Sequence, residues 1–267
     1  MSSVDPADPV PPDHSLHRLL ESLQDHLKRL ERATAPEVTS AAKAVEKEVV
    51  PAWRRATEGE NRLPVALAIA VAIALQLVLP SRLVIGPAWL LPTLEGLLFI
   101  GLTTANPRRI NRTSSVLRAA SVALIALISL ANAFATAKLI DGLINGTEGS
   151  SASVLISRGA SVYITNIIVF GLWYWEWDRG GPVARAQALR PYPDFLFPQM
   201  TQPALTPMDW QPNFIDYLYV SFTNATAFSP TDTMPLSRWA KMLMASQSAI
   251  ALLTVAFVIA RAVNILK

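Results

Sequence analysis

Hydrophobic residues along this chain gather into long blocks instead of alternating regularly with polar ones. Each block is about 17 to 25 residues long, the length that a helix needs to cross a bilayer core of about 30 Å. The pattern predicts an all-α, polytopic transmembrane helical bundle. Its five expected spans cover approximately Leu63–Leu79, Leu83–Thr104, Val116–Ile140, Ala160–Trp177 and Trp239–Ile265.

A shorter apolar stretch, Phe214–Phe228, precedes the last block. It is expected either to re-enter the membrane as a short helix or to form a sixth crossing. Residues 179–212, which separate it from the four-helix transmembrane region (61–178), are too polar to span. Seven prolines in this connection predict an extended segment. Residues 213–267 then form the C-terminal segment.

The first 60 residues lack such a block and form a separate region. Residues Met1–Pro12 hold four prolines and little apolar surface, so a disordered tail is expected there. Residues 13–60 are expected to form cytoplasmic amphipathic helices. In the first of them, leucines recur at alternating spacings of four and three, a seam that packs on the membrane or its own domain, or binds a partner helix. These leucines are Leu16, Leu20, Leu23, Leu27 and Leu30.

Basic residues predict the orientation of the bundle. The loop Asn106–Arg118 holds four arginines, whereas the loop Asn145–Ser157 has no Lys or Arg. Loops rich in Lys and Arg stay in the cytoplasm. The arginine loop and the N-terminus are therefore expected on the cytoplasmic side of a multi-pass protein, with a bacterial inner membrane as the expected location.

Composition supports the membrane assignment and narrows the chemistry. The chain is 51% hydrophobic and 16% charged, against about 25% charged residues in soluble domains. Its formal net charge of +3 comes from short basic clusters beside the apolar blocks, which favours the lipid bilayer over nucleic acid as the partner. The absence of cysteine excludes disulfides, thiolate catalysis and Cys-ligated metals. No cofactor and no metal site are expected.

A dense run of polar residues lies within the C-terminal segment, at or near membrane depth. Unpaired polar groups are costly in hydrocarbon, so this run should face protein or water. It is either a polar packing seam with an exposed turn, or the lining of a hydrated cavity or conduction path. The residues are Ser221, Thr223, Asn224, Thr226, Ser229, Thr231 and Asp232.

Two ionisable residues are expected inside the bilayer. Glu95 lies near the middle of the second expected span. It is either neutral and hydrogen-bonded inside the bundle, or part of an ion or proton relay, or accommodated by local adaptation of the bilayer. Lys138 lies near the end of the third span, where its side chain can extend to the interface. Candidate partners of Glu95 are Lys138, Asn132, Asn166 and Arg261.

The C-terminal segment resembles the pore module of the potassium-channel superfamily, which consists of a pore helix, a filter, an acidic residue with a proline three later, and an inner helix. The resemblance covers about 45 residues at the C-terminal end of the chain. Where such channels carry a Gly-Tyr/Phe-Gly triplet, this chain has Ser229, Pro230 and Thr231. A carbonyl-lined filter relies on glycine conformations, so a degenerate, non-potassium-selective pore segment is expected. The matching residues are Tyr219, Ser221, Thr226, Asp232 and Pro235.

The whole pattern also resembles an uncharacterised family of bacterial polytopic membrane proteins. In that family four spans precede a Tyr-Phe-Ser-Phe-Thr type segment, a Ser-x-Asp type turn and a last helix ending in Asn. The corresponding elements here are Tyr219–Thr223, Ser229–Asp232 and Asn264. This resemblance implies the architecture and no activity.

The sequence therefore favours an ion-channel-like or transport protein. The segment Tyr219–Asp232, backed by the last helix, would line a polar path at an interface between subunits. A homo-oligomer is expected, because one pore loop and one inner helix cannot enclose a path. The alternative is a non-conducting scaffold that recruits a cytoplasmic partner through the leucine seam. A lipid enzyme built on Glu95, Glu176, Asp178 and Asp232 is disfavoured, because no histidine or cysteine lies near the membrane.

Overall fold

The computed structural model divides the chain into two compact units, Met1–Val50 and Pro51–Lys267. It describes residues 50–105, 109–110, 114–148, 151–226 and 232–265. The expected disordered tail and the leucine seam from Leu16 to Leu30 lie outside the described residues. Ser229 and Thr231 of the polar run lie outside them as well.

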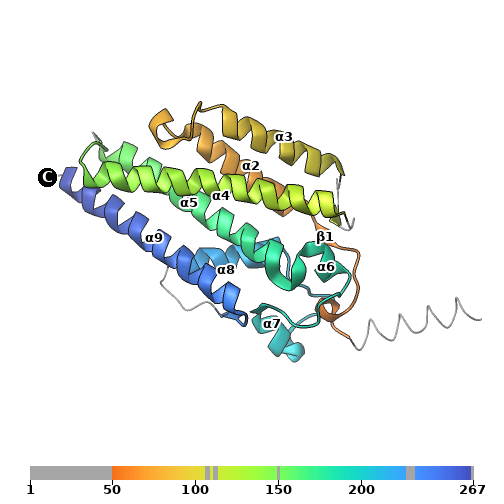
Figure 1. Cartoon of the computed structure of the whole chain (residues 1–267). Helices are drawn as coiled ribbons and strands as arrows, with labels where there is room; N and C mark the ends of the chain where they lie inside the picture. Colours follow the sequence, from red (N-terminus) through yellow and green to blue (C-terminus); the bar gives the residue numbers. More distant parts are fainter. Residues whose placement is uncertain (1–49, 106–108, 111–113, 149–150, 227–231, 266–267) are drawn as a thin grey trace, which may run out of the picture. The chain divides into compact units, whose positions relative to one another are not determined.

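The second unit is built from long helices that run side by side (Figure 1). Among the described residues, three helical segments are long and apolar enough to cross a membrane: Ser115–Ile144, Ala152–Gly180 and Arg238–Ile265. The mostly helical class of the prediction is thereby confirmed. Two further apolar helices are shorter, at 16 residues each. The long helices are α2 (Leu63–Val78), α3 (Leu90–Ala105), α4 (Ser115–Ile144), α5 (Ala152–Trp177) and α9 (Arg238–Ile265).

The second expected span begins later than its hydrophobicity suggested. After α2 the chain forms a short 3-10 turn, η2 (Ser81–Leu83), and α3 starts only at Leu90. Gly86 adopts a φ of 66°, a left-handed conformation that glycine accepts at little cost, and Pro87 follows it. This turn interrupts the apolar block Leu83–Thr104, which was predicted to form one helix.

The bundle has two ends, which we name by a buried residue at each. At the Arg185 end, α5 ends and α9 begins, since Trp177 and Trp239 meet edge to face there with ring centroids 5.5 Å apart. At the Glu148 end, α4 ends and α5 begins, and Arg82 of η2 pairs with Glu148 there. The α2–α3 hairpin therefore extends from β1 (Glu60–Asn61) at the Arg185 end to η2 at the Glu148 end.

The proline-rich connection is not one extended segment. It forms short helical turns at the Arg185 end, and prolines occupy the first position of three of them, where a missing N–H costs nothing. These elements are η3 (Asp178–Gly180), α6 (Pro182–Ala186), β3 (Phe195–Leu196), α7 (Pro198–Thr201) and η4 (Pro203–Leu205).

Two minimal antiparallel sheets tie distant segments together at the same end. In the first, β1 (Glu60–Asn61) pairs with β2 (Arg109–Ile110), so that Glu60 faces Ile110. In the second, β3 pairs with β4 (Met234–Pro235), so that Phe195 faces Pro235. A further short 3-10 turn, η1 (Ala52–Arg54), precedes β1. The second sheet fixes the start of α9 against the proline-rich connection.

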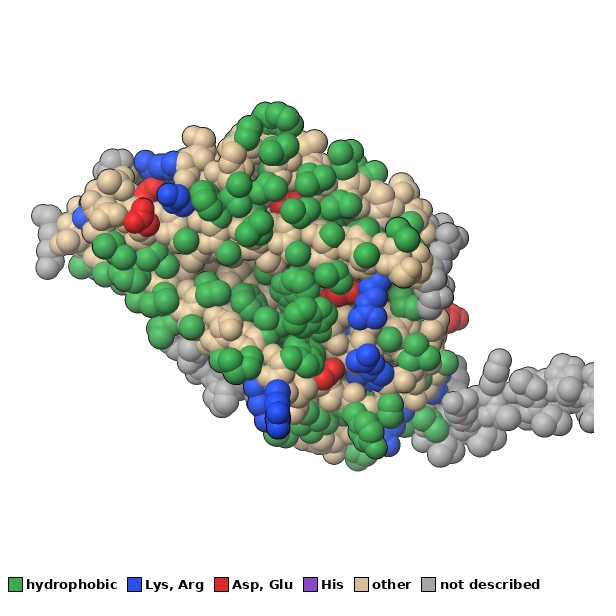
Figure 2. All heavy atoms as spheres, viewed as in Figure 1, with side chains coloured by type: hydrophobic (Ala, Val, Ile, Leu, Met, Phe, Trp, Pro, Cys, Tyr) green, Lys and Arg blue, Asp and Glu red, His purple; other side chains and the backbone are tan. Residues whose placement is uncertain are grey.

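The core lies around α5. The most apolar part of this helix is 61% buried, against 39% for α4 and 28% for α9. Leu172 and Tyr174 of α5 pack with Ile128 of α4 and Tyr217 of α8 (Phe214–Thr226) in one hydrophobic cluster. The outer helices expose large apolar side chains, among them Leu67 and Leu97. Figure 2 shows hydrophobic side chains spread over the length of the bundle, which suits contact with lipid.

Candidate functional site

A hydrogen-bonded polar seam joins α5, α8 and α9. The Gln247 side chain of α9 lies at its centre, with none of its surface exposed. Its Nε2 donates to Ser221 Oγ at 2.7 Å, and its Oε1 accepts from Tyr174 Oη at 2.6 Å and from Asn224 Nδ2 at 2.8 Å. Ser221 Oγ in turn donates to the Ile167 carbonyl at 2.6 Å. Four side chains from three helices are thus joined by direct hydrogen bonds.

This seam contains only part of the polar run that the sequence singled out. Ser221 and Asn224 belong to it. Thr223 and Thr226 instead donate to carbonyls of their own helix, those of Tyr219 and Thr223 respectively. Asp232 is exposed and lies with the turns at the Arg185 end, beside Leu196, Phe197, Pro198, Thr201, Gln202 and Met234. The structure therefore brings together two of the five described members of the run.

The path of α8 decides how these residues are placed. Phe214 at its start packs edge-on against Trp175, with centroids 6.1 Å apart, at the Arg185 end. Ala225 near its end packs with Ile167 and Ala251, which lie in the middle of α5 and α9. The chain is then back at the Arg185 end by β4 and Trp239. The 13 residues of α8 extend for about 20 Å, less than a bilayer core of about 30 Å, so α8 enters the bundle and does not cross it.

A close helix contact makes this entry possible. Gly171 of α5 faces α8, and a Cβ atom at that position would lie 3.2 Å from Leu218 Cα. The small residue lets the two backbones approach, as small residues do at helix interfaces in membranes. The outward face of α8 carries Ile215, Tyr219 and Phe222, which are all exposed. The inward face of α8 combines Ser221 with the buried side chains of Phe214, Tyr217, Val220 and Ala225.

Glu95 is fully buried between α2 and α3, and its partner is Gln76. The Gln76 Nε2 donates to both carboxyl oxygens, at 3.0 and 3.3 Å. The sequence suggested Lys138, Asn132, Asn166 and Arg261 as partners. Lys138 is exposed and lies over the Phe134 ring, and Arg261 donates to the carbonyls of Glu148 and Gly146. Gln76 is the one polar residue in the apolar block Leu63–Leu79. That isolated polar position was the signal in the sequence that could have identified it as the partner of Glu95.

A charged cluster at the Arg185 end was not predicted from the sequence. Arg185 of α6 pairs with Glu60 of β1 at 2.6 Å and also donates to the Trp175 and Asp178 carbonyls. Burial, the largest single influence, lowers the pKa of Arg185, but Glu60, Tyr217 and Asp178 together outweigh burial and raise that pKa above its ordinary value. Asp178 accepts from Tyr217 Oη at 2.5 Å and from the Asp194 backbone N–H at 2.7 Å. The cluster fastens β1, α6 and α8 to the end of α5.

The Glu148 end carries a second charged group. Glu148 is buried and accepts from Arg82 at 2.7 Å and from Arg158 at 2.9 Å, while Arg261 donates to its carbonyl. The loop Asn145–Ser157 has no Lys or Arg of its own. The fold brings in three arginines from flanking elements. The Glu148 carboxylate accepts from two of them, Arg82 and Arg158, and the third, Arg261, donates to the Glu148 backbone carbonyl.

No metal centre accounts for these groups within the part of the chain that the structure describes, where no three His, Cys, Asp or Glu side chains are placed to hold an ion together. Comparisons of the chain with protein-family models, with curated proteins and with solved structures found no match. The arguments about function therefore rest on the geometry of the seam, of α8 and of the two charged ends.

Proposed function

We propose that the chain is an integral membrane protein of channel-like architecture, in which α2, α3, α4, α5 and α9 cross the bilayer and α8 is a re-entrant helix. The observation that carries this proposal is the position of α8, which begins at the Arg185 end, ends in the middle of the bundle and is followed by a return to the same end. α2 and α3, at about 24 Å each, are somewhat short for a bilayer, and local thinning accommodates such a mismatch.

The C-terminal end of α8 carries partial negative charge in the middle of the bundle. The last four carbonyls of a helix lack partners within the helix, and the helix dipole places partial negative charge there. A re-entrant helix therefore presents that charge at the depth where a permeating ion is least hydrated, which favours cations. Thr223 and Thr226 add hydroxyl oxygens at this end. The polar path would pass here.

The path would need a second copy of the chain. The seam residues Ser221, Asn224 and Gln247 hydrogen-bond to one another, so their polar groups are engaged within one bundle and hold α8 in place. α9 is the least buried of the three long helices and α8 exposes Tyr219 and Phe222, so a second copy has a broad apolar face to pack on. We propose a homo-oligomer with the path between copies, and place the Arg185 end in the cytoplasm because more Lys and Arg residues lie there.

Ion flux in liposomes tests the proposal. Purified protein with an intact thermal transition is reconstituted, and potassium, sodium and proton fluxes are measured. Flux above that of empty liposomes is expected, and Thr226→Val should change its rate or cation preference several-fold. The matched control is Thr104→Val, because Thr104 is exposed at the end of α3 and donates to the Gly101 carbonyl. Folded protein without flux would rule out the channel-like reading.

In that case the scaffold alternative would remain, and a deletion tests it. The deletion should remove residues 1–49 and keep Ala52 and Trp53, because both are buried and Arg179 donates to the Trp53 carbonyl. A scaffold would lose its cytoplasmic partner, whereas a path through the membrane region would keep its flux.

A further inference from the structure

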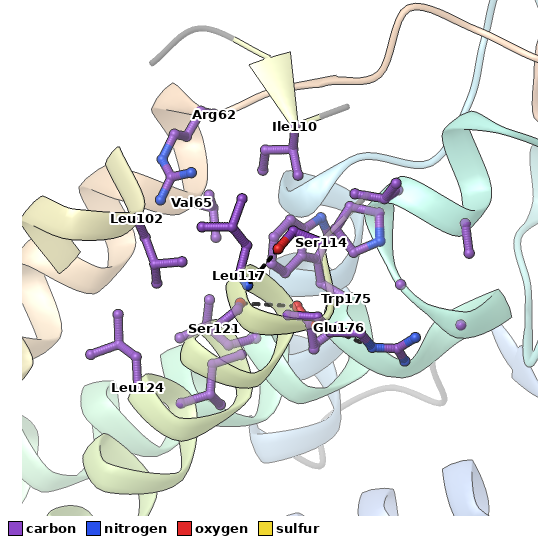
Figure 3. A pocket seen from close by; sticks show the side chains of 18 of the residues that line it. Arg62, Val65, Leu102, Ile110, Ser114, Leu117, Ser121, Leu124, Trp175 and Glu176 are labelled. Atoms are coloured by element: carbon purple, nitrogen blue, oxygen red, sulfur yellow. Dashed lines mark hydrogen bonds and ion pairs between the residues drawn. The ribbon is translucent and has the colours of Figure 1, made fainter. Parts of the chain in front are cut away.

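A cavity of about 370 Å³ opens at the Arg185 end between α2, α3, α4, α5 and α6. Its size falls within the range of about 300 to 1,000 Å³ that is typical of small-molecule sites. Its walls are apolar over most of their area. Figure 3 shows Val65, Leu102, Leu117 and Leu124 around this space. Leu172 and Val183 complete the apolar lining.

The polar groups of the cavity carry a net positive charge. Arg62 and Arg118 contribute two guanidinium groups, and Glu176 contributes one carboxyl group. Glu176 already accepts from Ser121 Oγ at 3.2 Å and lies 4.0 Å from Arg118 Nε. Its negative charge is thus engaged by the cavity's own donors, and a cationic ligand would have to compete with them.

Arg62 is the buried cation of the cavity. Only 7% of its surface is exposed, and its Nε is buried with no hydrogen-bond partner among the residues that the structure describes. Figure 3 shows its side chain at the rim of the cavity, beside Val65 and Leu102. Burial lowers the pKa of this guanidinium, because the charged form loses hydration. A buried donor of this kind is expensive unless an acceptor reaches it.

We propose that this cavity binds an anionic phospholipid of the surrounding leaflet, with its phosphate between Arg62 and Arg118 and part of one acyl chain against Leu102, Leu117 and Leu124. A phosphate offers several acceptor oxygens, and arginine binds phosphate through parallel hydrogen bonds. Basic pockets between membrane helices on the cytoplasmic side bind acidic headgroups in this way. The inference needs the bundle to lie in a membrane and does not depend on ion conduction.

Lipid binding to the full-length protein in detergent tests the proposal. Native mass spectrometry and thermal unfolding are recorded with phosphatidylglycerol and with phosphatidylcholine of identical chains. We expect phosphatidylglycerol to remain bound and to raise the melting temperature, and phosphatidylcholine to bind at least tenfold more weakly. Inorganic phosphate and dodecyl phosphate form two further arms, and both are expected to bind more weakly than phosphatidylglycerol. Equal binding of inorganic phosphate would overturn the lipid assignment in favour of a free anion.

Variants of the cavity distinguish the contribution of the lipid headgroup to binding from that of the acyl chain. Arg62→Gln and Arg118→Gln should each weaken phosphatidylglycerol binding about tenfold, the loss of one charge-assisted contact. Leu117→Trp should weaken binding by filling the cavity without changing its charge. Leu117 is only partly buried, so this variant remains informative if Arg62→Gln does not fold. Lys138→Gln removes an exposed cation elsewhere and should leave binding unchanged. Equal affinity for both lipids, or equal losses in all four variants, would overturn the proposal.

Discussion

The polar seam at mid-depth and the charged cluster at the Arg185 end are both buried, yet they are built from different chemistry. The seam uses only neutral groups, from Gln247, Asn224, Ser221 and Tyr174. The cluster uses Glu60, Arg185 and Asp178, whose hydrogen-bond partners include backbone carbonyls and N–H groups of the turns around them. The cost of an ionised group falls toward the water interface, and turns there supply free backbone partners. Depth in the bundle therefore selects between neutral and ionic polar contacts.

The largest expected loss of stability follows from a change in the charged cluster at the Arg185 end. Arg185→Met removes the cation that pairs with Glu60 and leaves that carboxylate, together with the Trp175 and Asp178 carbonyls, buried without their donor. We expect a loss of about 3 to 5 kcal/mol in the free energy of unfolding, measured by thermal denaturation in detergent. Arg238→Met at the exposed start of α9 is the matched control. A loss of less than about 1 kcal/mol would show that the cluster does not hold this end together.

The neutral seam should respond less strongly. Gln247→Leu preserves bulk but leaves Tyr174, Asn224 and Ser221 without their shared partner. We expect a loss of about 1 to 3 kcal/mol, since hydrogen bonds between membrane helices are individually modest. The same substitution at exposed Gln202 should be close to neutral. Equal melting temperatures for the Gln247 and Gln202 variants would mean that the seam does not fix α8.

Glu95 is an ionisable residue buried between two helices, yet its geometry favours a neutral carboxyl group, as expected for a polar contact at depth. The Gln76 Oε1 is buried without a hydrogen-bond partner among the described residues. With the Gln76 amide turned over, a protonated Glu95 would donate to Gln76 Oε1, which would give that oxygen a hydrogen-bond partner. Glu95→Gln should therefore change stability by less than about 1 kcal/mol, whereas Glu95→Leu should cost about 1 to 2 kcal/mol. Equal losses for both variants, compared by thermal denaturation, would indicate an ionised Glu95.

The smallest effect is expected at Lys138. Its side chain is exposed, and its described contact is a 5.9 Å approach to the Phe134 ring. Lys138→Gln should change the free energy of unfolding by less than about 0.5 kcal/mol. A larger loss in the same denaturation assay would place Lys138 in a network with Glu95 after all.

The lengths of the apolar blocks predicted the positions of the long helices well, because block length depends only on local sequence. The last span was expected over Trp239–Ile265, and α9 covers Arg238–Ile265. The start of α3 was missed, because a left-handed Gly86 is a local conformation that hydrophobicity does not report. The connection after α5 was expected to be extended, yet its prolines begin short helices.

The candidate site could be predicted only in outline. The polar run was identified from the sequence. Some of its residues join the seam, others donate to carbonyls of α8, and Asp232 is exposed. Which residue does which depends on the face of α8 that meets α5. The pairs Gln76–Glu95 and Glu60–Arg185 join residues 19 and 125 positions apart. Such pairs follow from tertiary packing, and a single sequence contains no local pattern that reports them. The unexpected arginines around Glu148 were missed for the same reason.

The re-entrant position of α8 is the claim on which the account depends, and cysteine accessibility tests it most directly. The chain contains no native cysteine, so single cysteines can replace the exposed residues Asp209 before α8, Asp232 after it and Ser153 at the start of α5. An impermeant maleimide is applied to intact and to opened vesicles. We predict that positions 209 and 232 are labelled from the same side and position 153 from the opposite side. Labelling of 209 and 232 from opposite sides would show that α8 crosses the membrane and would contradict the account.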